Sequence, residues 1–227
     1  MRLFKPYLLV IFMLYLTTLL YGNEDEHIHF KHITVDDGLS NNSAICFNQD
    51  TLGLMWIGTN DGLNMYNSAE FQVFRYRKDD ATSLSNNRVK SIVFDDKNNL
   101  WVGTEDGLNL FISNTSRFKR FYCDSSEKKE LFTNNINTLF PYNDKIFLGT
   151  DKGLKILDTA KNSFIHFPVI GLDGPDIKNV AAIMKDSRNN IWVGTESGLL
   201  YYNKNFKLIT TFPGIDKIAW GNSIVEE

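Results

Sequence analysis

The sequence has few cysteines, histidines and prolines, and it has no excess of positive charge. Its 227 residues include 2 cysteines, 4 histidines and 5 prolines, and the formal net charge is −3. Two cysteines, Cys46 and Cys123, exclude a disulfide framework and a four-thiolate metal site. Nucleic acid is not an expected partner, because there is no basic surplus to neutralise its phosphates. The composition favours a globular chain around an ordinary apolar core, with no cofactor and no metal centre expected.

The sequence also has few long apolar runs, and the one it has lies at the start of the chain. Two basic residues precede an apolar run over 7–21, and a small residue, Gly22, follows it. This pattern predicts a secretory signal peptide over 1–22, cleaved after Gly22. The alternative is an uncleaved membrane anchor, although the run is shorter than the roughly 20 residues that a spanning helix needs. We expect the mature chain, 23–227, outside the cytoplasmic membrane, in the periplasm.

An eight-residue motif recurs four times and determines the predicted fold class. It reads Trp-Ile-Gly-Thr-Asn-Asp-Gly-Leu at 56–63 and returns, with changes, at 101–108, 147–154 and 192–199. The first glycines of the four motifs are 45, 46 and 45 residues apart. A period of about 40–50 residues is typical of β-propellers. The motif residues to which we assign a structural role are Trp56, Gly58, Thr59, Gly62, Trp101, Gly103, Thr104, Gly107, Phe147, Gly149, Thr150, Gly153, Trp192, Gly194, Thr195 and Gly198.

Each repeat reads as four short strands joined by polar turns. An apolar pair such as Val89 and Ile92 is followed by a turn, the motif strand, a glycine turn and two further strands, of which the last alternates as in 118–121. This predicts an all-β protein, a β-propeller with four four-stranded blades. The blades should start near residues 41, 86, 134 and 178. We expect the motif aromatic to fill the space between blades and the first glycine to admit a close neighbour.

Both ends of the chain predict that the ring of blades is incomplete. The segment 29–33 resembles the fourth strand of a blade, and 218–227 resembles the first strand of a fifth blade that starts near 220. We therefore expect the chain, with its propeller region over 23–227, to be the N-terminal piece of a longer protein. Because unpaired strand edges promote association, we expect this piece to aggregate when it is expressed alone.

The repeats resemble a known family at specific residues. Asp37-Gly38-Leu39-Ser40-Asn41-Asn42 precedes the first motif, and the motif Trp-Ile/Val-Gly-Thr-x-x-Gly-Leu recurs after an Asp-containing turn. This sequence is similar to the two-component regulator propeller repeats, the N-terminal periplasmic sensor region of bacterial hybrid two-component systems that combine a sensor histidine kinase with a response regulator. The third repeat departs from the pattern, with Phe147 in place of tryptophan and a shortened turn at Asn143-Asp144.

The resemblance implies a ligand, partners and a function. Members of the family sense oligosaccharides derived from glycans and relay the signal to a kinase, here expected beyond these residues. The implied partners are an oligosaccharide, further propeller blades and downstream signalling domains, with a homodimer as a further expected arrangement. The chain itself is then a non-enzymatic sensor module. The ligand residues stay unassigned, but loops at one face or the central channel, rich in Asn and Ser, are suited to sugar hydroxyls.

Other candidate sites have simpler explanations, and one alternative function stays open. His27, His29 and His32 read better as the polar face of an edge strand than as metal ligands. Cys46 aligns with a small residue in the next repeat, which favours a buried, inert thiol. The alternative is a self-contained secreted propeller, either a carbohydrate-binding module or a polysaccharide-degrading enzyme. An assay for unsaturated sugar release would discriminate a lyase from a sensor.

Overall fold

All of the described strands belong to one compact unit. The computed structural model describes residues 30–122, 134–165 and 179–213. The chain divides into two units, Met1–His32 and Ile33–Glu227, and the strands lie in the second. Within the described ranges the helical structure is one 3-10 turn, η1 (Val35–Asp37), and no helix there is long and apolar enough to span a membrane.

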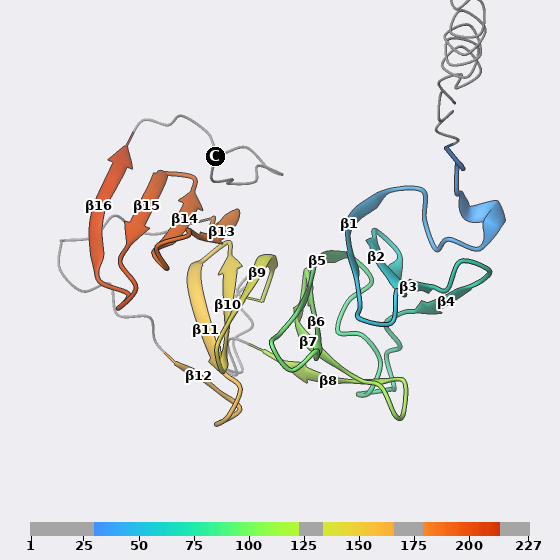
Figure 1. The fold of residues 1–227 in the computed structure, drawn as a ribbon. Coiled ribbons are helices and arrows are strands. Elements are labelled where there is room, and N and C mark those ends of the chain that lie inside the picture. The colour runs from blue at the N-terminus through green and yellow to red at the C-terminus, as the bar shows by residue number, and fades with distance from the viewer. Residues whose placement is uncertain (1–29, 123–133, 166–178, 214–227) are drawn as a thin grey trace, which may run out of the picture. The chain divides into compact units, whose positions relative to one another are not determined.

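The described residues form four sheets, each a blade of four antiparallel strands in chain order (Figure 1). This confirms the predicted all-β fold with four-stranded blades. The first blade contains β1 (Ala44–Gln49), β2 (Met55–Thr59), β3 (Gly62–Tyr66) and β4 (Phe71–Phe74), and the second contains β5 (Val89–Phe94), β6 (Leu100–Thr104), β7 (Gly107–Ile112) and β8 (Arg117–Phe121). The third contains β9 (Ile136–Tyr142), β10 (Lys145–Thr150), β11 (Gly153–Asp158) and β12 (Ser163–Ile165), and the fourth contains β13 (Ala182–Lys185), β14 (Ile191–Thr195), β15 (Gly198–Tyr202) and β16 (Leu208–Pro213).

The motif threonine and the second motif glycine build the turn between the second and third strands. Gly62 has φ +126°, a conformation that glycine adopts without strain. The hydroxyl of Thr59 donates to the carbonyl of Gly62 at 3.1 Å and accepts the N–H of Asp61 at 3.0 Å. The same pair of hydrogen bonds recurs in the other three blades. The spacing Gly-Thr-x-x-Gly is therefore the sequence requirement of this turn.

An aspartate before the motif strand builds the preceding turn in three of the blades. The Oδ1 atom of Asp95 accepts the N–H groups of Lys97 at 3.0 Å and Asn99 at 2.9 Å, and its Oδ2 atom accepts the indole N–H of Trp101 at 2.9 Å. Asp50 and Asp186 accept the corresponding indole N–H at 3.2 and 3.1 Å. One carboxylate thus closes the turn and orients the aromatic ring of the next strand.

The apolar core lies between the blades. Each of three buried clusters combines the motif aromatic of one blade with apolar residues of the next blade, which lie in its first two strands or just before them. The three sets are Trp56 with Val89, Ile92 and Val102, Trp101 with Ile136, Leu139 and Leu148, and Phe147 with Val180, Ile191 and Val193. Neighbouring blades therefore stabilise each other by burial of apolar surface, and no blade carries a complete core of its own.

The first motif glycine admits a side chain of the following blade. A Cβ atom on Gly58 would lie 2.5 Å from Cγ1 of Val89, and one on Gly103 would lie 2.7 Å from Cγ2 of Ile136. A Cβ atom on Gly149 would lie 2.7 Å from Cγ1 of Val180. These separations are shorter than real Cβ contacts, so each of these glycines leaves the space that the neighbouring valine or isoleucine occupies.

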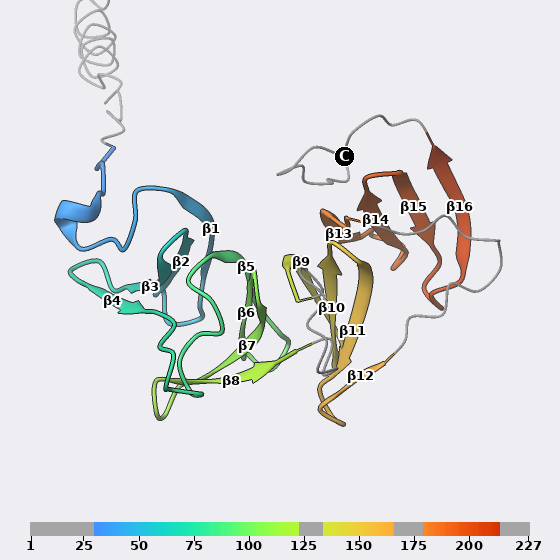
Figure 2. The same ribbon diagram turned by 180° about the vertical axis from the view of Figure 1, so that it is seen from behind.

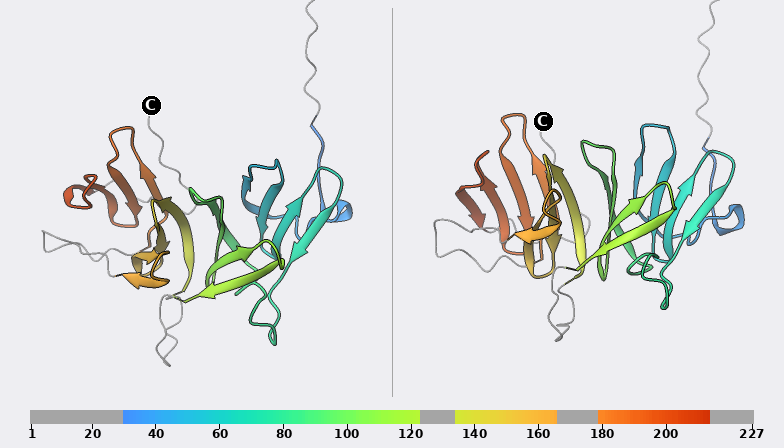
Figure 3. Two further views of the ribbon diagram at one scale, coloured as in Figure 1. Left: turned by 60° about the horizontal axis from the view of Figure 1, so that its bottom comes forward. Right: turned by 90° about the horizontal axis from the view of Figure 1, so that it is seen from below.

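The first strands of successive blades lie side by side, with β1 next to β5, β5 next to β9, and β9 next to β13 (Figures 1 and 2). The views in Figure 3 show the four blades from other directions. Ile92 and Leu139 are each 5% exposed, whereas Phe47, at the same position of the first blade, is 73% exposed. This face of the first blade has no neighbouring blade within the described residues.

The strand expected at 29–33 is not formed in the described part of that segment. Residues 30–34 are irregular, and Phe30 is 92% exposed. A fourth strand needs the third strand of its own blade, and each of the four described third strands already pairs with its own fourth strand. The signal peptide over 1–22, the start of a fifth blade near 220, and Cys123, His27 and His29 lie outside the described residues.

Candidate ligand-binding face

The turns between second and third strands meet the segments that lead into the next blades. The N–H of Gly62 donates to the carbonyl of Asn87 at 2.7 Å, and that of Gly107 donates to Asn134 at 2.9 Å. In the third blade the N–H of Asn179 donates to the carbonyl of Asp151 at 3.0 Å. These turns and segments together form one end of the blades, here called the loop face, which holds many of the Asn and Ser residues noted in the sequence.

The Asn and Ser side chains of the first two blades are engaged in fixing the loop face. The side chain of Asn64 accepts the N–H of Ser40 at 2.8 Å and donates to its hydroxyl at 2.8 Å. Asn109 makes the same two bonds to Ser85, at 2.9 Å each. The third strands of the third and fourth blades have Lys155 and Leu200 at the equivalent positions, so this arrangement is specific to the first two blades. Its role is to hold the loops, and it leaves few of these amides for a ligand.

Three first strands carry a one-residue bulge at the same position. In β1 the pairing register shifts between Ala44 and Cys46, and in β5 it shifts between Val89 and Ser91. In β9 the residues Ile136 and Thr138 face consecutive residues of β10. The extra residues are Ile45, Lys90 and Asn137. A bulge re-aims its side chain and is frequent beside functional sites, so these three positions are the natural candidates for ligand contact.

Lys90 and Asn137 belong to a polar cluster that crosses from the second blade to the fourth. Lys90 Nζ donates to Oδ1 of Asn135 at 3.1 Å and to Oδ1 of Asn137. Asn135 and Asn137 donate in turn to the two carboxylate oxygens of Asp151, at 2.6 and 2.8 Å. Asn137 also donates to Oδ1 of Asn179 at 3.4 Å. We call these five residues the inner-strand cluster, because it is centred on β5 and β9.

The inner-strand cluster combines charge with partial exposure. Burial lowers the pKa of Lys90, while the nearby Asp151 and Glu105 act in the opposite direction. Lys90, Asn137, Asp151 and Asn179 are half-buried, and Asn135 is 6% exposed. The cluster therefore holds an ammonium group, a carboxylate and three amides in fixed positions within reach of solvent. Such groups can donate to and accept from the hydroxyl groups of a polar ligand.

The other candidate residues show no arrangement for chemistry. Burial raises the pKa of Cys46 to about 12, which keeps its thiol protonated and unreactive at neutral pH. His32 is exposed in an irregular segment. In the described ranges no three His, Cys, Asp or Glu side chains come together as metal ligands. The motif residues lie in the inter-blade cores and turns described above, and the motif turn of the third blade, between Thr150 and Gly153, also carries Asp151 of the inner-strand cluster.

Sequence reasoning did not identify the inner-strand cluster. Its members come from positions 90 to 179 and meet through contacts between blades. The available signal was the polar residue inside an apolar pair, since Lys90 follows Val89 and Asn137 follows Ile136. In an unbroken strand a neighbour of a core position points to the opposite face, and the sequence does not show the bulge that changes this direction.

The fold and the repeated turn chemistry define the class of protein, a β-propeller built from sequence repeats. The family model described as Two component regulator propeller matches residues 38–61, 83–106 and 174–197. These matches cover parts of three of the four repeats and agree with the family resemblance that the sequence showed. A histidine kinase of Formosa agariphila is 40% identical over 62 residues, which is 27% of this chain and 4% of that protein.

Solved structures support the fold. The extracellular domain of a putative hybrid two component system from B. thetaiotaomicron has a TM-score of 0.52 at 23% identity, covering 79% of this chain and 31% of that one. The extracellular domain of a putative one component system from the same organism has a TM-score of 0.63 at 24% identity, covering 85% and 24%. Virginiamycin B lyase from Staphylococcus aureus has a TM-score of 0.59 at 8% identity, covering 79% and 58%. The chain spans 4% of the histidine kinase and 24–31% of the two extracellular domains.

Proposed function

We propose that this chain is the ligand-sensing propeller region of an exported two-component signalling protein. In this proposal the inner-strand cluster binds an oligosaccharide derived from a glycan, and the rest of the protein relays the signal to a kinase across the membrane. The region acts as a binding module and carries no catalytic step. The observation that carries the proposal is the bulge repeated in three consecutive first strands of a regulator-type propeller, which directs Lys90 and Asn137 into one polar cluster.

Signal relay requires that the ligand favour one arrangement of the protein over another. The inner-strand cluster suits this requirement because it connects three blades through side chains alone. A ligand that hydrogen-bonds to Lys90 and Asn137 would contact the second and third blades at once. Asn179 extends the connection to the fourth blade. Binding would therefore bias the relative positions of neighbouring blades, and the change would reach any domain that packs against them.

Binding of an oligosaccharide panel to the complete chain tests this proposal. Lys90→Met keeps most of the apolar stem and removes the ammonium group, and Lys161→Met is the matched control because Lys161 lies in the turn before β12. We expect at least one oligosaccharide to bind the wild type and the control, with roughly tenfold weaker binding to Lys90→Met. Equal affinity of all three proteins for every bound glycan would contradict the assignment of the site.

Two further measurements test the sensor assignment against a self-contained propeller. Incubation with acidic polysaccharides should release no unsaturated sugar, since the region is proposed to lack a catalytic step. The reading frame in the gene should continue beyond the codon for Glu227 through more repeats into a membrane helix and a kinase. A stop codon at that point would contradict the proposed relay and would leave a binding propeller.

A further inference from the structure

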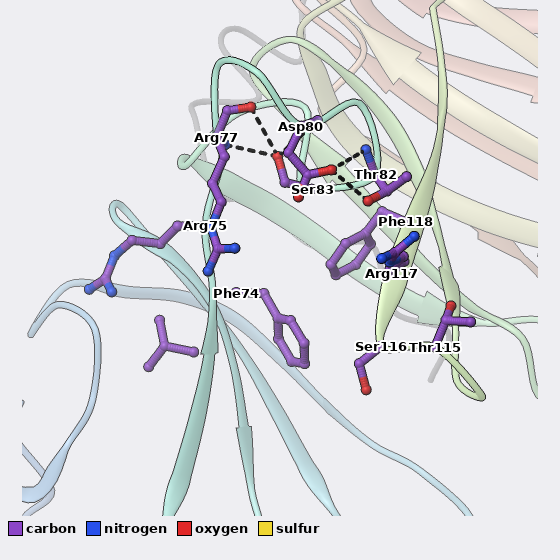
Figure 4. Close-up of a pocket in the computed structure, with 11 residues that line it drawn as sticks. Phe74, Arg75, Arg77, Asp80, Thr82, Ser83, Thr115, Ser116, Arg117 and Phe118 are labelled. Atoms are coloured by element: carbon purple, nitrogen blue, oxygen red, sulfur yellow. Dashed lines mark hydrogen bonds between the residues drawn. The ribbon is translucent and has the colours of Figure 1, made fainter.

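A cavity lies between the outer strands of the first two blades, and none of its lining residues belongs to the inner-strand cluster. Its volume is about 230 Å³, and it is lined by the end of β4, the segment 77–83 that leads to the second blade, and the turn before β8 (Figure 4). The lining includes three arginines, Arg75, Arg77 and Arg117, and one carboxylate, Asp80. The chain as a whole has a net charge of −3, so this concentration of positive charge is local.

The walls of the cavity are fixed by hydrogen bonds that do not use Arg77 or Arg117 as side-chain donors. Arg120, on β8, donates to the carbonyl of Ser83 at 2.8 Å, and to the Ser83 hydroxyl and the Asp80 carbonyl at 2.7 Å each. The N–H of Phe118 donates to the carbonyl of Thr82 at 2.7 Å. The segment that carries Asp80 is therefore anchored to the second blade before any ligand binds, which reduces the entropic cost of binding.

The charged groups of the cavity differ in whether they have partners. Arg75 is paired with Asp61, with a separation of 3.1 Å between its Nη2 atom and Oδ2. Among the residues that the structure describes, the guanidinium groups of Arg77 and Arg117 have no hydrogen-bond or ion-pair partner. Both are exposed, and in Figure 4 Arg77 extends toward Phe74 while Arg117 lies beside Phe118. Two unpaired guanidinium groups thus face one small cavity.

The neighbouring carboxylate does not cancel this charge. The hydroxyl and N–H of Thr82 donate to Oδ1 of Asp80, at 2.5 and 2.8 Å. These hydrogen bonds lower the pKa of Asp80, and the charges of Arg117 and Arg77 add to the effect. Both arginines therefore lie close enough to Asp80 to feel its charge, yet neither forms a direct pair with it. The hydroxyl groups of Thr115 and Ser116 complete the polar lining.

We propose that this cavity binds a small ligand carrying a single carboxylate or sulfate group, held by Arg77 and Arg117. A guanidinium group pairs with such oxyanions through two parallel N–H bonds, and Arg77 and Arg117 supply two such groups in the lining of one cavity. The cavity is smaller than the roughly 300–1,000 Å³ typical of sites for drug-sized molecules, so it accommodates one small unit such as a sugar acid. This inference goes beyond the proposed function and does not depend on the ligand of the inner-strand cluster.

The experiment compares charged and neutral sugars that have the same ring. D-glucuronate, D-glucose 6-sulfate and D-glucose are titrated into the complete chain at low salt, with heat or chemical-shift change as the readout. The test variant is Arg77→Gln combined with Arg117→Gln. The matched control is Arg188→Gln, an exposed arginine in the turn before β14 of the fourth blade. Equal melting temperatures of all variants establish that the fold is kept.

We expect at least one of the two anionic sugars to bind the wild type and the control more tightly than D-glucose does. The double variant should bind that sugar roughly tenfold more weakly than the wild type does, or too weakly to measure. Added salt should weaken binding to the wild type. The proposal is overturned if D-glucose binds as tightly as the anionic sugars, if no anionic sugar binds, or if the double variant binds as the control does. Binding of both anionic sugars would assign the site to oxyanions generally, and binding of one would define its preference.

Discussion

The second and third blades pack in the same way but differ in the turn that precedes the motif strand. In the second blade Asp95 caps its own turn and accepts the indole N–H of Trp101. In the third blade the ring of Phe147 has no N–H to donate, and the shorter turn passes through Asn143 at φ +52°. Phe147 is nevertheless 0% exposed, and Trp101 is 2% exposed. The aromatic therefore has two separable roles, filling the space between blades and closing the turn.

The third blade is held from outside where it lacks the Asp–Trp bond. The ring of Phe206, in the turn before β16, stacks on Phe147 with a centroid separation of 5.1 Å. Asp144, in the short turn, accepts from Nζ of Lys97 in the second blade at 2.6 Å. Contacts from the neighbouring blades thus replace a contact within the blade. This difference predicts how much corresponding substitutions in the two blades lower the free energy of unfolding.

The largest expected effect is at the first motif glycine, which packs against the following blade in both the second and the third blade. Gly149→Ala places a Cβ atom 2.5 Å from Cγ2 of Thr138 and 2.8 Å from the carbonyl oxygen of Val180, a backbone atom that has little freedom to move. We expect a loss of about 3 kcal/mol in the free energy of unfolding, measured by urea denaturation.

Gly103→Ala is the comparison in the second blade, where the nearest atoms belong to side chains, Cγ2 of Ile136 at 2.7 Å and Cδ1 of Leu139 at 3.4 Å. Its cost should be smaller because side chains adjust more easily than backbone. Ser113→Ala, at an exposed turn position, is the control and should change stability little. Equal stability of Gly149→Ala and the control would contradict the close packing between blades.

The second prediction converts the second blade into a copy of the third. Trp101→Phe removes the indole N–H that Asp95 accepts and leaves a small gap, so we expect a loss of about 1–3 kcal/mol. In an Asp95→Asn background the same substitution should cost less, because the charge on the acceptor is already gone. A double-mutant cycle from denaturant melts measures the difference. An unchanged cost in the two backgrounds would show that the bond contributes nothing beyond packing.

The third prediction uses pH to isolate the turn of the second blade. Burial acts to raise the pKa of Asp95, but the hydrogen bonds from Trp101 and Asn99 outweigh it and hold the pKa below its ordinary value. The stabilisation is therefore complete above the ordinary aspartate pKa of about 4, and it is lost as the pH falls toward the lower pKa of the folded state.

Asp95→Asn should accordingly flatten the acid side of the stability curve. Melting temperatures between pH 2 and 6 measure this effect, and Asp144→Asn is the comparison in the third blade. The pKa of Asp144 is lowered by Lys97, which donates to it and attracts its charge, but both groups are exposed. We expect its substitution to alter the curve less. If the melting temperatures of wild type and Asp95→Asn decreased identically at acid pH, Asp95 would not contribute to the pH dependence of stability.

The smallest expected effect is at the ion pair that links the two blades. Lys97→Met removes the partner of Asp144 on the surface of the molecule. Solvent screens such pairs, so we expect a small decrease in melting temperature at low salt and no difference from wild type at high salt. A large decrease that persists at high salt would mean that Lys97 supports the short turn by packing and not by charge.

The fold was predictable from the sequence because its determinants are local and repeated. Gly58, Thr59 and Gly62 each have a task within one blade or toward its neighbour, and four copies make the period unmistakable. The inner-strand cluster was not predictable, since Lys90 and Asn137 meet across a blade boundary after a bulge that leaves no pattern in the sequence. Arg77 and Arg117 are likewise 40 residues apart and share a cavity only in the folded chain.

The fit between a glycine of one blade and a side chain of the next has a consequence for how such chains grow. The second and third repeats each carry both halves of the contact, a valine or isoleucine toward the preceding blade and a glycine toward the following one. A tandem duplication of one such repeat therefore creates one new boundary, between the two copies, at which these halves already match. The number of blades can change by tandem duplication without compensating substitutions, whereas a duplication of half a repeat would bring mismatched surfaces together.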